Sequence, residues 1–394
     1  MYDFDQVIDR SNTDAVKIEQ CRQLFGSADV TPLWIADMDF AVPQPIQRVI
    51  EERLSRGILG YTERTQAFGR CVSRWQQQRH GWTVDPAHVE YSPGVMPSIV
   101  IALRHVTAPG DGVIIQPPVY PPFFDAVSHN GRRLVLNHLV RDSEGRFGMD
   151  FDEFERLASQ PDVKAFVLCH PHNPVGREWT PAELTALGDI CVRHGVRVIS
   201  DEIHSDIMLG RRRHVPFASL RPEFADISYT MMAASKAFNI TGLSTSYVIA
   251  SNPELMEGYR SRLAAAHLSN STVFGPIATQ AAYTHCAPWL DELLDYLTDN
   301  VDTVCRFIAD RMPEVLVSKP EATFLLWLDF SQLGLSRTDL HNAIFGKARV
   351  GLNDGLMFGD RYGQCLRLNV ATPQSVLMDA MERIAQVCSM LRPK

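Results

Sequence analysis

Short, nearly continuous runs of apolar and β-branched residues set the strongest limit on how this chain can fold. They lie at residues 112–116, 163–169, 196–200, 229–233 and 247–250. A strand with one solvated face alternates apolar and polar residues, whereas a strand covered on both faces does not. The runs therefore predict strands that are buried between two layers of helices.

A helix is predicted between two of these runs. Thr180 and Pro181 are typical of an N-cap and a first helical position, an acid follows at Glu183, and apolar residues recur behind it at helical spacing. The order of strand, helix and strand repeats from about residue 90 to 250. This repetition predicts an α/β domain with a largely parallel central sheet.

The C-terminal part of the chain has a different pattern. Residues 290–311 predict one long amphipathic helix, 323–330 and 366–370 predict strands, and the apolar residues of 376–391 keep helical spacing. We expect a smaller α+β domain here, and an extended arm in the turn-rich N-terminal forty residues. The predicted division is an arm with part of the small domain at 1–47, a large domain at 48–287 and a small domain at 288–394.

Charge excludes several classes of protein. The 394 residues contain 38 Lys and Arg against 46 Asp and Glu, which gives a net charge of −8, and the only basic run is Arg211 to Arg213. We therefore expect no nucleic-acid binding. No stretch approaches the ~18 apolar residues of a membrane span, and the first residues carry acids and no apolar signal core, so a cytoplasmic protein without a membrane partner is predicted. The eight cysteines form no C-x-x-C pair and are expected to be buried free thiols.

The common catalytic signatures are missing. The sequence contains no G-x-G-x-x-G after a strand, no phosphate-binding G-x-x-x-x-G-K-[ST], no H-E-x-x-H and no G-x-S-x-G. His170 and His172 could suggest a metal, but prolines stand at 171 and 174 and no third ligand lies nearby. We therefore predict a turn at this point and no metal.

Polar side chains follow three of the predicted strands. Asn173, Asp201 and Lys236 each stand just after an apolar run. Alone, the lysine could be a surface charge and the aspartate a helix cap. Ligands bind at the carboxyl ends of strands in open α/β sheets, so we expect the three side chains to converge on one site.

An Asn-Pro turn, an Asp after a strand and a Ser-Lys pair, in this order, resemble the class I/II aminotransferase superfamily of pyridoxal 5'-phosphate (PLP) enzymes, fold type I. The resemblance covers nearly the whole chain, and it is closest to the cystathionine β-lyase, or carbon-sulfur lyase, branch. It implies a large domain with a mostly parallel seven-stranded sheet and a smaller α+β domain. Further segments that carry it are 32–40, 60–62, 91–95, 116–124, 200–206, 235–240 and 367–369.

The resemblance implies roles around the cofactor ring. Lys236 would hold PLP as a Schiff base and then move the substrate α-proton, for which burial would lower its pKa. Asp201 would accept a hydrogen bond from the pyridine nitrogen, and Asn173 would donate to the ring 3-oxygen. His204 stands where many relatives have a tyrosine, so a cofactor contact and a merely packed histidine both stay open.

Further positions would hold the ring face and the phosphate. Tyr120 would stack on the ring. Gly94, Val95 and Met96 open a predicted helix whose backbone N–H groups suit a phosphate, and Ser235 would add a hydroxyl. Ser244 stands where an arginine is frequent, and Ala233 replaces a frequent hydroxyl residue, so the phosphate charge must be balanced by other groups.

Substrate binding is also implied. Arg367 would hold the substrate α-carboxylate through a bidentate fork, and the backbone of Ala36 would contact the same group. Asn173 would also contact the substrate. Tyr61 resembles a catalytic tyrosine that reaches the neighbour's cofactor across a dimer interface. The resemblance therefore implies a homodimer with shared active sites.

We predict a PLP-dependent carbon-sulfur β-lyase that cleaves L-cystathionine or cysteine S-conjugates to a thiol, pyruvate and ammonia. The first alternative is a class I/II amino-acid aminotransferase with the same site. The second is a PLP-binding regulatory protein with little turnover, for which the sequence offers no positive sign.

Overall fold

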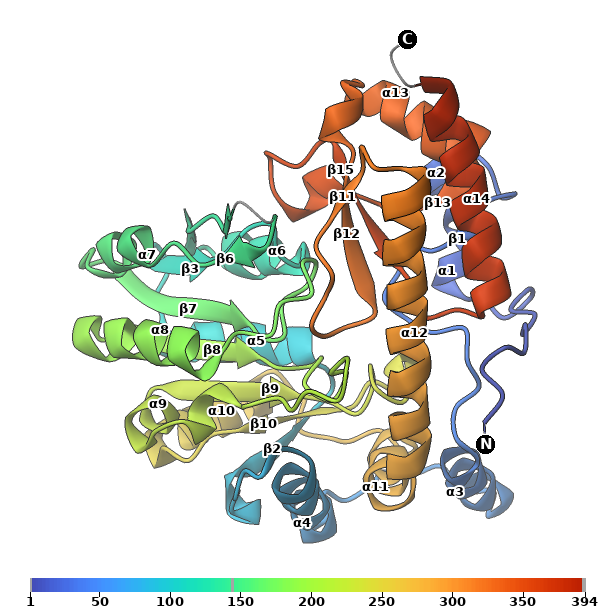
Figure 1. Cartoon of the computed structure of the whole chain (residues 1–394). Helices are drawn as coiled ribbons and strands as arrows, with labels where there is room; N and C mark the ends of the chain where they lie inside the picture. Colours follow the sequence, from blue (N-terminus) through green and yellow to red (C-terminus); the bar gives the residue numbers. More distant parts are fainter. Residues whose placement is uncertain (1, 143–144, 392–394) are drawn as a thin grey trace.

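A computed structural model describes residues 2–142 and 145–391 of the chain. Its centre is a seven-stranded mixed sheet in the order β2-β10-β9-β8-β7-β3-β4, whose strands are coloured from blue at β2 through green at β7 to yellow at β10 in Figure 1. Strand β10 is antiparallel to both of its neighbours, and the other pairs are parallel. The predicted mostly parallel α/β fold is confirmed. The strands are β2 (Val89–Ser92), β3 (Gly112–Ile115), β4 (Arg133–Leu136), β7 (Val163–Cys169), β8 (Arg197–Asp201), β9 (Ser228–Met232) and β10 (Ser246–Ile249).

Helices cover both faces of this sheet, which explains why its strands are apolar throughout. Helices α5 (Val95–Val106), α6 (Pro122–Ser128) and α10 (Pro253–Ala265) form one layer. The opposite layer contains α7 (Phe151–Ala158), α8 (Pro181–His194) and α9 (Pro222–Asp226). Helices α3 (Gln44–Ser55), α4 (Gln66–Trp75) and α11 (Gly275–His285) pack together beside the β2 edge.

Helix α8 begins where the sequence predicts. The Thr180 side chain accepts from the N–H of Glu183, and the Glu183 carboxylate accepts from the N–H of Thr180, which makes a capping box. Pro181 occupies the first helical position, where a missing N–H costs nothing. The helix ends at Gly195, whose φ of +68° suits a residue without a Cβ.

The second lobe is built mainly from the C-terminal part of the chain (Figure 1). Its four-stranded sheet has the order β11-β12-β15-β14. The long helix α12 (Ala287–Arg311) runs along this lobe, with α13 (Arg337–His341) and α14 (Gln374–Leu391). The strands of this sheet are β11 (Leu316–Val317), β12 (Leu325–Asp329), β14 (Asn353–Asp354) and β15 (Cys365–Asn369), and a separate hairpin pairs β5 (Val140–Arg141) with β6 (Phe147–Gly148).

The N-terminal segment packs on this second lobe. Strand β1 (Thr31–Pro32) pairs in parallel with β13 (Val350–Gly351), although more than three hundred residues separate them. The expected extended arm also contains two short helices, α1 (Val16–Glu19) and α2 (Cys21–Phe25). We propose that the large domain begins at residue 48 and the C-terminal small domain at residue 288.

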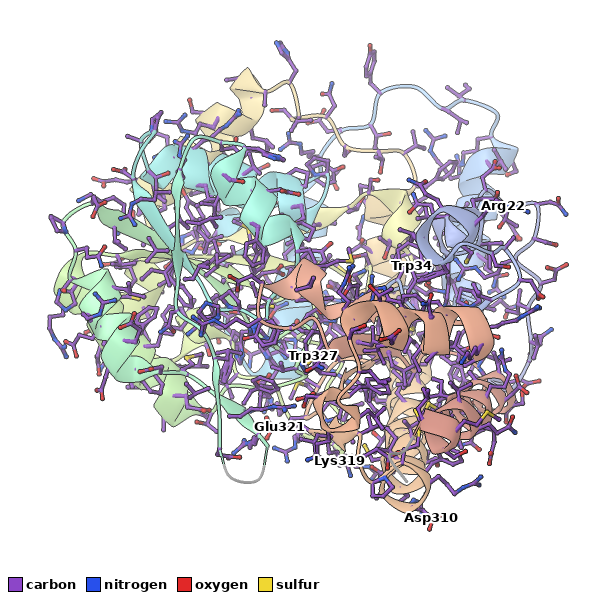
Figure 2. All side chains as sticks on the ribbon, turned by 90° about the horizontal axis from the view of Figure 1, so that it is seen from above. Arg22, Trp34, Asp310, Lys319, Glu321 and Trp327 are labelled. Carbon is purple, nitrogen blue, oxygen red and sulfur yellow. The ribbon has the colours of Figure 1, made fainter. Side chains whose placement is uncertain are left out.

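The two lobes meet along a junction that side chains fill. Figure 2 shows Glu321 and Trp327 where the C-terminal part adjoins the central part of the chain. Glu321 forms ion pairs with Arg146 and Arg177 at 2.6 and 3.0 Å. None of the eight cysteines, all of which lie in the described part of the chain, forms a disulfide, and six of them are buried. Among the described residues, no helix has the length and apolar character that crossing a bilayer requires.

Candidate active site

Strands β7, β8 and β9 are parallel neighbours, so their carboxyl ends lie at one edge of the sheet. Asn173, Asp201 and Lys236 follow these strands and line one cavity of about 610 Å³, as the sequence predicts. Every other candidate residue except Tyr61 lines the same cavity. These residues are Ala36, Gly94, Val95, Met96, Tyr120, His204, Ser235 and Arg367.

Lys236 presents its amine to this cavity. Its Nζ donates to the carbonyl oxygen of Ala36 at 2.6 Å. Burial, with the charge of Arg367 adding to the effect, lowers the pKa of the amine to about 8. An amine with such a pKa reaches its neutral, nucleophilic form near physiological pH.

Asp201 is buried at the end of β8. Its Oδ1 accepts from the N–H of Ile203 at 3.1 Å, and it forms no ion pair within residues 2–142 and 145–391. Burial raises the pKa of the carboxyl group to about 7. A ligand that brings a cationic N–H would relieve this cost, so the carboxylate fits the ring nitrogen of a pyridinium.

Arg367, on β15, is held in a fixed position at the cavity wall. Its Nη1 donates to Oδ1 of Asn173 at 2.9 Å, and its Nη2 donates to the carbonyl oxygen of Trp34 at 2.9 Å and to Oδ1 of Asn353 at 2.5 Å. The guanidinium lies 5.0 Å from the ring centre of Phe358. Burial lowers its pKa to about 10, so it stays cationic at neutral pH. This geometry suits a carboxylate ligand.

The turn at residues 34–40 is fixed by two asparagines that stand close in sequence to the key cations. Asn239, three residues after Lys236, bonds the backbone of Met38 and Phe40 through its side chain. Asn369, two residues after Arg367, donates to the carbonyl oxygens of Ile35 and Asp37 at 2.6 and 2.7 Å. These contacts set the position of Ala36 beside the Lys236 amine.

One end of the cavity suits a phosphate without an arginine. Gly94 is the N-cap of α5, which has twelve residues. The N–H groups in the first turn of such a helix can donate hydrogen bonds to an anion. Lys236 and Arg367 are the only basic Lys or Arg side chains among the described residues that line the cavity. Hydroxyl groups line the wall where the sequence lacks the frequent arginine: Ser235, Thr241, Ser244, Thr245 and Ser246.

His204 is neutral in this environment. Burial lowers its pKa to about 3, with the cations Lys236 and Arg367 adding to the effect. Its Nδ1 has no hydrogen-bond partner among the described residues, and its ring packs edge-on against Phe324 at 6.0 Å. An uncharged imidazole that lines the cavity can bond a ligand oxygen or nitrogen.

Tyr61 lies outside the cavity of its own chain. Its side chain is 100% exposed, and the apolar residues before it are also open to solvent, with Ile58 73% and Leu59 50% exposed. A single chain therefore brings together all the predicted site residues except this one.

Sequence reasoning missed Asn353, which fixes Arg367. It lies on the two-residue strand β14, which has no periodic pattern, and only the pairing of Asn353 with Arg367 across the sheet shows its position. The hydrogen bonds from Asn239 and Asn369 to the backbone of the 34–40 turn were also not predicted, although both asparagines stand in segments that carry the resemblance.

Comparison with known proteins identifies similar chains. The class I and II aminotransferase family matches residues 28–384. A protein named cystathionine beta-lyase PatB from Bacillus subtilis (strain 168) is 42% identical over 386 residues, covering 98% of this chain and 100% of the relative. The structure of cystalysin from Treponema denticola, which contains PLP, has a TM-score of 0.96 at 32% identity and covers 100% of both chains. The PLP-bound C-S lyase from Staphylococcus hominis has a TM-score of 0.91 at 31% identity, covering 98% of each chain.

Proposed function

Because this chain belongs to the class I and II aminotransferase family, we propose that it is a PLP-dependent carbon-sulfur β-lyase that acts on L-cystathionine or a related cysteine S-conjugate. One observation carries the proposal: Asn173, Asp201, Lys236 and Arg367 line a single cavity. The relatives named a cystathionine beta-lyase and C-S lyases support the reaction type.

The chemical groups of the cavity residues and their positions are suited to binding PLP. Asp201 offers a buried carboxylate to the pyridine nitrogen, Asn173 an amide to the ring 3-oxygen, and Tyr120 an aromatic face. The N-terminus of α5 and the hydroxyl wall would hold the phosphate. When bound, PLP supplies an electron-accepting ring that stabilises negative charge at the substrate α-carbon.

The chain's own residues would then orient the substrate and move protons. Arg367 binds the α-carboxylate and so turns the α-hydrogen toward Lys236. The neutral amine of Lys236 removes that proton, and a thiolate leaves from Cβ. Hydrolysis of the remaining fragment gives pyruvate and ammonia.

The same residues would serve an aminotransferase, so the product decides between the two functions. We expect the purified enzyme to release thiol, pyruvate and ammonia from cystathionine in equal amounts without an added keto acid. The assay measures all three products, beside amino transfer to a keto acid. Turnover that strictly requires the keto acid and releases no thiol would establish the aminotransferase instead. Binding of PLP without either reaction would favour a regulatory protein.

Arg367→Ala should weaken every amino-acid substrate alike. Removing a charged hydrogen bond costs ~1.5 to 3 kcal/mol, so we expect KM to rise by about 10- to 150-fold while kcat changes less. Steady-state kinetics on two substrates with different side chains would check this. Asn353→Ala, which leaves the guanidinium in place but removes one of its anchors, should raise KM by a smaller factor. An effect that depends on the substrate side chain would contradict the assignment.

We further propose a homodimer in which Tyr61 of each chain completes the neighbour's site. The support is the full exposure of Tyr61 and the large exposed fraction of the apolar residues before it, Ile58 and Leu59, a surface that a second copy would cover. We also propose a cytoplasmic location, because eight cysteines that form no disulfide fit a reducing compartment.

Mixing two inactive variants would test the shared site. Chains carrying Lys236→Ala and chains carrying Tyr61→Ala should each be nearly inactive. After unfolding and refolding together, half of the dimers are mixed, and each mixed dimer has one intact site, so about a quarter of the wild-type activity should return. An active monomer would exclude the shared arrangement. So would the absence of any recovered activity when mixed dimers are shown to be present.

A further inference from the structure

A second cluster of titratable side chains lies behind the active site and takes no part in the function proposed above. It consists of His170, Glu178 and His214, whose nitrogen and oxygen atoms all lie within 4.8 Å of one another. Both histidines are fully buried, and the Glu178 side chain is 11% exposed. We call it the His-Glu cluster.

The fold, and not the sequence, assembles this cluster. His170 directly follows β7, and the turn predicted here is present, closed by a hydrogen bond from the N–H of Gly176 to the carbonyl oxygen of His172. The third ligand that the sequence lacked near His170 is His214, which comes from a loop 44 residues further along the chain. Glu178 follows the same turn, so two segments supply three donors.

The donor spacing fits a tetrahedral metal. Nδ1 of His214 lies 3.0 and 3.3 Å from the two oxygens of Glu178, and Nε2 of His170 lies 3.7 Å from the nearer one. Zinc binds His nitrogen and carboxylate oxygen at about 2.0 to 2.2 Å, which places neighbouring donors of a tetrahedron about 3.4 Å apart. The separations from Glu178 lie on both sides of this value, and the donor nitrogens of the two histidines lie within 4.8 Å of each other.

An outer carboxylate is already in place. Nε2 of His214 contacts Oε2 of Glu202 at 2.8 Å, which leaves Nδ1 toward Glu178. Glu202 is fully buried and is itself held by the hydroxyl of Ser200 and the N–H of Phe217. A carboxylate that accepts from the far nitrogen of a metal-bound histidine is a common outer partner of zinc sites.

Carboxylate oxygens face His214 on both sides of its ring. Its Nδ1 lies 3.0 Å from Glu178, and its Nε2 lies 2.8 Å from Glu202. Two carboxylates therefore lie close together in the interior, where a bound cation would offset their charges.

His170 can adapt to this role. Its Nε2 donates to the carbonyl oxygen of Val215 at 3.1 Å, while its Nδ1 is buried without a partner among the described residues. Moving the hydrogen to Nδ1 frees Nε2 for a metal. A cavity of about 500 Å³, lined by His214, His80 and Ser205, offers a route for the ion.

We propose that the His-Glu cluster binds one divalent transition-metal ion of the zinc class, through His170, Glu178 and His214, with Glu202 as the outer partner of His214. The site is separate from the cofactor cavity, because none of its four residues lines that cavity. The ion would fasten the loop after β7 to the loop that carries His214.

Zinc and cobalt titrations of the PLP-loaded enzyme test the proposal. After treatment with a chelator, the wild-type protein should take up one Zn²⁺ per chain, measured by equilibrium dialysis and elemental analysis. Co²⁺ should give the visible absorption of a four-coordinate site without the near-ultraviolet band of thiolate ligands, which separates this site from binding at cysteines. Less than one bound ion per chain, or a thiolate band, would overturn the proposal.

Ligand variants locate the ion. His170→Asn and Glu178→Gln should each weaken Zn²⁺ binding more than tenfold, and Glu202→Gln should weaken it by about 10- to 100-fold. The control, His285→Asn, replaces an exposed histidine and should bind zinc normally. Unchanged affinity in both ligand variants would overturn the assignment. If those variants fail to fold, the wild-type stoichiometry and cobalt spectrum still decide the question.

Discussion

Lys236→Ala should abolish both the covalent retention of PLP and turnover. Lys236 is the only amine among the described residues that line the cavity, and burial has already lowered its pKa to about 8. Loss of a general base alone costs about 10²- to 10⁴-fold in rate. Loss of the covalent link to the cofactor adds to this, so residual turnover should be close to the detection limit.

The measurements are the cofactor's visible absorbance after denaturing gel filtration and the rate of pyruvate release. Lys347→Ala is a matched control, because it removes an exposed lysine that does not line the cavity and should change neither quantity. A small primary amine added to the Lys236→Ala enzyme should restore part of the turnover, which a purely structural defect would not allow. Normal turnover in Lys236→Ala would refute the assignment of the base.

The strands and the site that they form were predictable because local and long-range signals agree. The apolar run at 163–169 matches β7 in full, and the capping residues before Pro181 mark the start of α8. Once the strands are parallel neighbours, the groups that follow them must meet at one edge. The convergence of Asn173, Asp201 and Lys236 therefore follows from topology alone.

The N-terminal arm shows why other parts could not be predicted. Helix α1 has only four residues and no side-chain cap, so its sequence carries no helical signal. Its position is fixed instead by Lys17, which is 1% exposed and forms ion pairs with Asp39 at 2.8 Å and Asp37 at 3.5 Å. Contacts of this kind join segments that only the folded chain brings together.

The same limit applies to Asn353 and to the His-Glu cluster. Each depends on a partner that is distant in sequence, and neither an isolated asparagine nor an isolated histidine suggests a role. Single-sequence patterns find side chains at the ends of strands but do not show which loops lie against them.

Asp201→Asn should reduce turnover while leaving PLP bound. The asparagine keeps an acceptor for the N–H of Ile203 but no longer provides the charge that keeps the pyridine nitrogen protonated. A neighbouring opposite charge shifts a pKa by about 1 to 3 units. A loss of two units at the ring nitrogen corresponds to ~2.7 kcal/mol, or about a 100-fold slower reaction if it appears fully in the transition state. Rates of pyruvate release and the pH dependence of the cofactor spectrum would measure both effects.

The same substitution should stabilise the cofactor-free protein, and this opposite effect separates a functional loss from misfolding. In the folded chain the carboxyl group of Asp201 has a pKa of about 7, against 3.8 as the ordinary value. Between these values the folded state holds a proton that the unfolded state has lost, so the stability of the wild type falls as pH rises from about 4 to 7. Asparagine cannot ionise, so the folded variant does not bear the cost of a buried carboxylate at high pH. The melting temperature of cofactor-free Asp201→Asn should therefore exceed that of the wild type above pH 7, and the difference should shrink toward pH 4. Equal melting temperatures at pH 8 would show that the buried carboxyl group already has a charge partner, and the catalytic role of Asp201 would then need another explanation.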